Sequence, residues 1–163
     1  MSDDVTPSPL SPRGFLMLML AGALATAAFD IYGQVISPTL GGSRLAPVPL
    51  AGSVWRAIAG FPSKEMAELL HYTAGVIGYP LGFALVARPI WQKVLPKLPW
   101  YLVAVGFGCA QWVFALYIMA HLIAGQPAFL GFTGITWAAL YGHIVYALVA
   151  IGVSNHFMLA RRP

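Results

Sequence analysis

Charged side chains are scarce in this sequence: Asp, Glu, Lys and Arg make up 9% of its 163 residues. Hydrophobic residues make up 59%, and the mean hydropathy is +0.76. A soluble domain of this length cannot bury so much apolar surface. The composition therefore excludes an ordinary soluble domain and predicts a membrane protein with a single domain.

Cysteine is nearly absent as well, because Cys109 has no second thiol with which to pair. An intrachain disulfide and a cysteine-based zinc site are therefore excluded. The nine Lys and Arg residues are scattered around apolar runs, which argues against a nucleic acid partner. Nucleophile elbows, phosphate-binding loops, dinucleotide fingerprints and metalloprotease helices are also missing, so nothing in the sequence indicates an enzyme.

Most of the sequence consists of apolar runs. Four of them are long enough to cross a bilayer as helices, which takes about 20 residues each. They lie at about 15–37, 65–87, 100–124 and 135–158. Because spanning helices satisfy their own backbone hydrogen bonds, we predict an all-α, antiparallel four-helix transmembrane bundle. This single domain would occupy residues 15–163, after a flexible, proline-rich tail at 1–14.

The distribution of Lys and Arg between the short loops predicts the orientation. With the N-terminus in the cytoplasm, six cations lie inside and three lie outside. The inner set is Arg13, Arg88, Lys93, Lys97, Arg161 and Arg162, and the outer set is Arg44, Arg56 and Lys64. Because cytoplasmic loops carry the excess of positive charge, we expect both termini in the cytoplasm.

The outer connection between the first two segments is too short and too rich in proline to span the bilayer. It contains GSVWRAIAGF at residues 52–61, which predicts a short amphipathic helix with Trp55 at the membrane interface. The first segment includes ALATAA, which has the small residues of a signal-peptide cleavage site. We favour an uncleaved helix, because the residues before it are acidic apart from Arg13 and its apolar run is long.

Ionisable residues are few inside the predicted helices, and each helix has one at a similar depth. They are Asp30, His71, His121 and His143, with Tyr72 and Tyr146 beside them. At helical rise, these depths are about 6 to 13 Å from the outer helix ends. Since polar groups that face lipid are costly, we expect the side chains of this polar layer to point inward and toward one another.

Three interpretations of the polar layer stay open. Buried Asp and His side chains on facing helices can fix the packing of a bundle through hydrogen bonds. Three imidazoles and a carboxylate also match the ligand set of a divalent metal, and two histidines on facing helices suit a b-type haem. A third interpretation is the handling of protons or a small solute by His and a buried Asp.

Glycines recur on the second segment at positions 75, 78 and 82. Small residues at such spacing let a neighbouring helix approach closely, so we predict helix packing at Gly75, Gly78 and Gly82. The neighbour would belong to the bundle, to a membrane protein partner or to a second copy of the chain. The favoured function is a non-enzymatic accessory or partner-binding membrane subunit, and the alternative is a protein that binds haem or metal or handles protons.

Three short motifs resemble a group of small bacterial inner-membrane proteins, the YagU-like and related families: GALATAAFD, HYTAGVIG and GHIVYALVAIG. The match is carried by Ala25, Thr26, Asp30, His71, Tyr72, Gly75, His143 and Tyr146. The resemblance implies a helical fold in a bacterial inner membrane and a role for the polar layer. It implies no established activity.

Overall fold

The computed structural model describes residues 8–159, and this part of the chain is mostly helical, without a β-strand. Four long helical stretches make up most of it, and each is long and apolar enough to cross a membrane. They are Pro12–Thr39, Lys64–Val94, Trp100–Ile123 and Gly134–His156. The predicted all-α architecture with four long apolar helices is confirmed.

The stretches are assembled from consecutive elements. The first contains α1 (Pro12–Ile31), the π-helical segment η1 (Tyr32–Ile36) and α2 (Ser37–Thr39). The second contains α4 (Lys64–Thr73), η2 (Ala74–Gly78), α5 (Tyr79–Gly82), η3 (Phe83–Ala87) and α6 (Arg88–Val94). The third is α7 (Trp100–Val113) with η4 (Phe114–Ile123), and the fourth is α8 (Gly134–Leu159). The connections contain α3 (Pro47–Ala59) and the 3-10 helix η5 (Ala128–Phe132).

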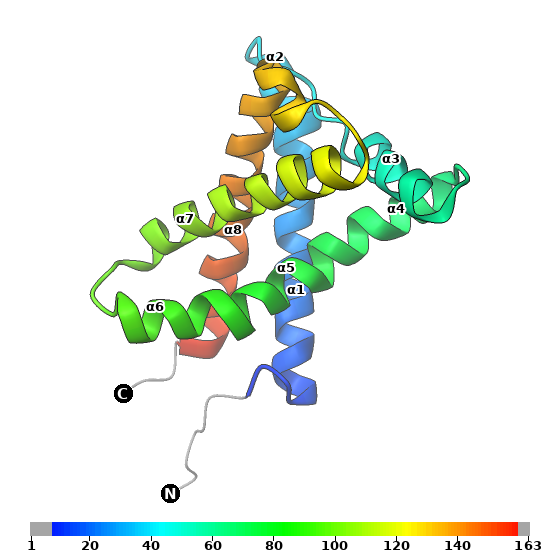
Figure 1. Cartoon of the computed structure of the whole chain (residues 1–163). Helices are drawn as coiled ribbons and strands as arrows, with labels where there is room; N and C mark the ends of the chain where they lie inside the picture. Colours follow the sequence, from blue (N-terminus) through cyan, green and yellow to red (C-terminus); the bar gives the residue numbers. More distant parts are fainter. Residues whose placement is uncertain (1–7, 160–163) are drawn as a thin grey trace, which may run out of the picture.

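The four stretches pack as two pairs that cross each other (Figure 1). Helices α1 and α8 lie side by side, and the hairpin of the second and third stretches crosses them. Successive stretches run in opposite senses. As a result, the start of α1, the end of α8 and the connection after α6 lie in the lower and left parts of the view, whereas α3 and η5 lie in the upper and right parts.

Glycines allow the closest contacts between the crossing pairs. A methyl group added to Gly22 in α1 would overlap the Val76 carbonyl and would lie 2.7 Å from the ring of Pro80. A methyl group on Gly108 in α7 would lie 2.7 Å from the Cα atom of Ile144 in α8. Small residues at these positions therefore let the backbones meet, which is how helices gain packing energy without a hydrophobic driving force.

Proline residues do not end these helices where the sequence predicted. We expected the first helix to end at Ser37 and the second near residue 87, because the residue before a proline avoids helical geometry. The helices instead continue through Pro38, Pro80 and Pro89, each of which lies two residues after a five-residue π-helical segment. A wider π turn makes room for the proline ring and removes the need for its missing N–H. The two predicted ends are therefore wrong.

Capping residues explain the ends of other helices. The Ser11 hydroxyl accepts a hydrogen bond from the Gly14 N–H at 3.1 Å, so α1 begins at Pro12, within the predicted tail. Residues 1–7 of that predicted tail lie outside the described residues. Gly125 adopts a left-handed φ of 70° after η4, and its N–H donates to the His121 carbonyl. A glycine is favoured there because it has no Cβ to clash.

The amphipathic helix predicted at residues 52–61 is present as α3, but it starts earlier. Pro47 occupies a first-turn position, where its missing N–H costs nothing, and Gly60 ends the helix with a left-handed φ of 82°. Val54 is buried on its inner face, whereas Ala57 and Ile58 are exposed. Helix α3 thus lies on the molecule with one apolar face turned inward.

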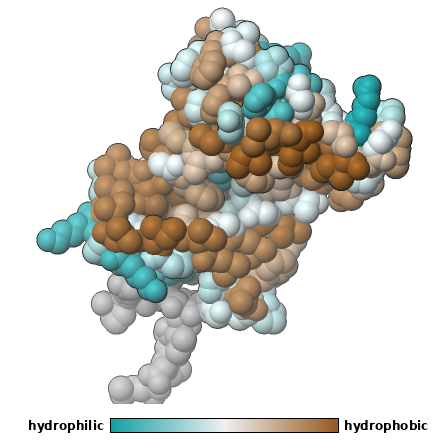
Figure 2. All heavy atoms as spheres, viewed as in Figure 1, coloured by the Kyte–Doolittle hydropathy of each residue, from teal (hydrophilic) through white to brown (hydrophobic). Residues whose placement is uncertain are grey.

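Exposed apolar side chains cover the outside of the long helices. On α1 they include Leu16, Leu20 and Leu24, which are 67%, 47% and 47% exposed. Figure 2 shows hydrophobic residues over the faces of the crossed stretches and strongly hydrophilic residues toward their ends. Such a surface suits lipid and is too apolar for a soluble monomer.

Candidate functional site

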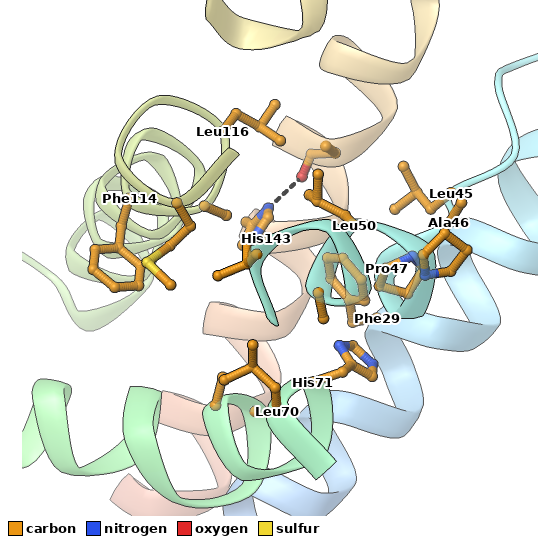
Figure 3. Close-up of a pocket in the computed structure, with 18 of the residues that line it drawn as sticks. Phe29, Leu45, Ala46, Pro47, Leu50, Leu70, His71, Phe114, Leu116 and His143 are labelled. Carbon is orange, nitrogen blue, oxygen red and sulfur yellow. Dashed lines mark hydrogen bonds between the residues drawn. The ribbon is translucent and has the colours of Figure 1, made fainter. Parts of the chain in front are cut away.

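A cavity of about 360 Å³ lies where α1, α3, the second stretch, η4 and α8 meet (Figure 3). Most of its walls are apolar, and α3 contributes Leu50 and Val54. The polar side chains in the walls are Thr26, Ser53, His71, Tyr79, Gln126, His143 and Tyr146. A mostly apolar cavity of this size with a few polar groups is typical of a site for a small molecule.

Asp30 and His71 form a pair beside the cavity. The Nε2 atom of His71 lies 3.3 and 3.4 Å from the two carboxylate oxygens of Asp30. The amide of Gln34, one helical turn further along, donates to the same carboxylate at 3.2 Å. A carboxylate only accepts, so His71 donates through Nε2. Asp30 therefore lies within hydrogen-bond reach of one of the three histidines, His71.

The register between α1 and the second stretch creates this pair. Thr26 lies four residues before Asp30, and Gly75 lies four residues after His71, so the two antiparallel helices meet at both levels. A methyl group on Gly75 would overlap the Thr26 side chain, whose hydroxyl donates to the Gly22 carbonyl at 2.8 Å. The close approach at Gly75 therefore brings Asp30 within reach of His71.

A π-helical segment supplies a second polar link. In η2 the backbone carbonyl of Gly75 accepts a hydrogen bond from the Tyr146 hydroxyl of α8. Tyr146 is buried, and its ring lies 5.6 Å from that of Tyr79. Because π turns leave carbonyls without the usual helical partner, η2 can accept this bond from another helix. The link holds α8 against the second stretch at the cavity wall.

His143 reaches the cavity from α8 but does not join the pair. Its Nδ1 atom donates to the Ala139 carbonyl at 2.7 Å, and the residue is 6% exposed. The ring of Phe29 lies between the two imidazoles, with centroids 5.1 Å from His143 and 6.3 Å from His71 (Figure 3). Both histidines therefore contact one aromatic ring rather than each other.

His121 and Tyr72 lie apart from this arrangement. The Nδ1 atom of His121 is 2.8 Å from the Gln126 carbonyl, in the connection that follows η4. Tyr72 is 48% exposed and contacts the His71 ring from outside the cavity. Within residues 8–159 no three His, Cys, Asp or Glu side chains lie close enough to hold a metal ion. The predicted four-member layer is corrected to the Asp30 and His71 pair, with His143 separate.

The glycine stripe on the second stretch also requires correction. Gly75 lies at a tight contact with α1, but a methyl group on Gly82 would meet nothing within 4 Å. One on Gly78 would meet only the Thr73 carbonyl of its own helix, at 3.8 Å. The π turn η2 shifts the helical phase, so the three glycines do not share one contact surface. Of these three glycines, Gly75 alone packs closely against another helix.

Sequence reasoning missed Tyr79 and the contribution of α3. Tyr79 lies four residues after Gly75, one turn along the helix, and this spacing was a usable signal. The side chains of α3 and Leu130 carried no such signal, because only the folded chain brings these connections over the cavity. The Thr136 hydroxyl donates to the Phe129 carbonyl and so fixes the connection that carries Leu130.

No known protein family, no curated protein and no solved structure matches this chain. The resemblance to the YagU-like group therefore stays a prediction. Five of the residues that carry it lie together: Asp30 pairs with His71, Thr26 packs on Gly75, and Tyr146 bonds to the Gly75 carbonyl.

Proposed function

We propose that this chain is a multi-pass membrane protein that binds an amphipathic small molecule in the cavity and acts as a binding or accessory subunit rather than an enzyme. The observation that carries the proposal is the cavity of about 360 Å³, whose walls are mostly apolar. An apolar molecule of matching size from the bilayer would gain dispersion contacts with these walls.

The position of the cavity supports a ligand that enters from the lipid. It lies beneath α3, toward the end of the molecule opposite to the start of α1. With the positive-inside orientation, this end faces outward, and the cavity lies in the outer half of the bilayer. We propose a bacterial inner membrane as the location and a cytoplasmic position for both termini.

A cavity-filling variant tests the proposal. Ala51 lies in the cavity wall, and Ala57 lies on the exposed face of the same helix, so both can be replaced by Phe. The purified protein is incubated in detergent with para-nonylphenol, and bound molecules are counted by native mass spectrometry. We expect one probe molecule per chain for the native protein and for Ala57→Phe, and none for Ala51→Phe. Equal binding by both variants would exclude the cavity as the site.

A further inference from the structure

Several hydrogen-bonding atoms of the cavity walls have no partner in the described part of the chain, and two of them, on His143 and Tyr79, belong to side chains whose rings lie next to each other. His143 bonds only through Nδ1, which leaves Nε2 free, and the Tyr79 hydroxyl forms no hydrogen bond. Neither atom is fully enclosed by protein, in contrast to the side-chain amide of Gln111. Both residues line the cavity, so a ligand can reach both atoms.

The chemistry of His143 defines what it can bind. A carbonyl only accepts, so the proton of the imidazole is on Nδ1, where it is donated to Ala139. In this tautomer the neutral ring offers Nε2 to the cavity as an acceptor. The matching ligand group is a donor, and a hydroxyl is the simplest donor without charge.

Charge restricts the ligand further. Among the described residues, the cavity walls contain no Lys, Arg, Asp or Glu. Asp30 lies behind His71, which already occupies its carboxylate. An anionic headgroup would find no Lys or Arg in the cavity walls, and a cationic headgroup would find no Asp or Glu there. The ligand is therefore uncharged.

Aromatic rings around the free Nε2 acceptor of His143 restrict the shape of the ligand. The ring of His143 meets Phe29 and Tyr79 edge to face, with interplanar angles of 68° and 79°. A planar ring of a ligand can pack on these side chains in the same edge-to-face or offset-stacked geometries. Aliphatic side chains such as Leu50, Leu116 and Ile135 line the rest of the cavity and suit an apolar tail.

We infer that the cavity selects an uncharged phenolic amphiphile, a phenol or quinol ring with an apolar tail, whose hydroxyl donates to His143 Nε2. This inference rests on the proposed function and concerns binding alone. The Tyr79 hydroxyl is placed to donate to the oxygen of the same ligand, since it lines the cavity and its ring contacts His143.

A matched set of probes tests the inference: para-nonylphenol, nonylbenzene, para-nonylbenzoic acid and dodecanol. Binding is measured by native mass spectrometry and by thermal shift in detergent. One hydrogen bond in the cavity should favour para-nonylphenol over nonylbenzene by about five- to tenfold in Kd. Equal affinity for these two probes, or tighter binding of the acid or of dodecanol, would overturn the inference and leave the proposed function intact. Failure of every probe to bind would overturn both.

Variants test whether the preference for para-nonylphenol over nonylbenzene depends on His143 Nε2 and on the Tyr79 hydroxyl. His143→Phe keeps an aromatic ring but removes the acceptor, so we expect para-nonylphenol to bind no more tightly than nonylbenzene. Tyr79→Phe should lower the preference by about threefold, and Tyr72→Phe, outside the cavity, should leave it unchanged. A full preference in both cavity variants would overturn the inference. If His143→Phe does not fold, the comparison of Tyr79→Phe with Tyr72→Phe decides.

Discussion

Asp30 is held by hydrogen bonds whose loss should lower the stability of the protein. Its carboxylate accepts from His71 and from Gln34, and its side chain is 21% exposed. Asp30→Leu leaves both donors without a partner, so we expect a loss of about 1 to 3 kcal/mol in the free energy of unfolding. Asp30→Asn keeps an acceptor oxygen and should cost less than half as much. Thermal unfolding in detergent measures both, and equal stability of the leucine variant and the native protein would contradict the pairing.

Gly75 and Gly82 form a matched pair on the same helical stretch. A methyl group on Gly75 would force the Thr26 side chain away from its hydrogen bond to Gly22, whereas one on Gly82 would meet nothing. Gly75→Ala should therefore lower the free energy of unfolding by about 1 to 3 kcal/mol through overpacking. Gly82→Ala should leave it unchanged or raise it by up to about 1 kcal/mol, because alanine is the better helix former. The opposite order of melting temperatures would refute the close contact.

At the scale of elements, the contact between α7 and α8 contains a polar group that finds no partner. Gln111 is 3% exposed, and neither atom of its amide has a hydrogen-bond partner within the described residues. An unsatisfied buried amide costs about 1 to 3 kcal/mol. Gln111→Leu, which has similar volume, should thus keep the melting temperature or raise it. A clear loss of stability would show that a bound water or ligand satisfies the amide.

Prolines shape the elements in a way that simple helix rules do not capture. Pro38, Pro80 and Pro89 stay within long helices because a π-helical segment precedes each one. The second of these segments, η2, also provides the carbonyl that Tyr146 binds at the cavity wall. The irregularity that accommodates Pro80 therefore also links two helices at the candidate site.

At the scale of the whole molecule, orientation in the membrane is the testable property. The native Cys109 is replaced by Ala, and a single cysteine is introduced at Leu40 or at Val94, which are 80% and 68% exposed. Because the loop cations favour the inside by six to three, an impermeant thiol reagent should label Leu40→Cys in intact cells. It should label Val94→Cys only after permeabilisation. The reverse pattern would invert the proposed topology.

The sequence by itself determined the four long helices, because an apolar run of sufficient length has few alternatives in lipid. It also predicted α3 and a histidine within reach of Asp30, since amphipathic spacing and the cost of a charge in lipid are local properties. The second helix was predicted to start near residue 65 and starts at Lys64, where the Ser63 hydroxyl accepts from the Met66 N–H at 3.2 Å.

Only the tertiary structure decided which polar residues meet. The depth of a residue along a helix does not define the direction of its side chain. A π turn contains more residues than an α turn and so rotates the side chains that follow it about the helix axis. His121 therefore bonds to a connection, His143 lies across Phe29 from His71, and Gly82 has no neighbour. The cavity depends on α3 and on the crossing of two helix pairs, and these arise from contacts between residues far apart in the chain.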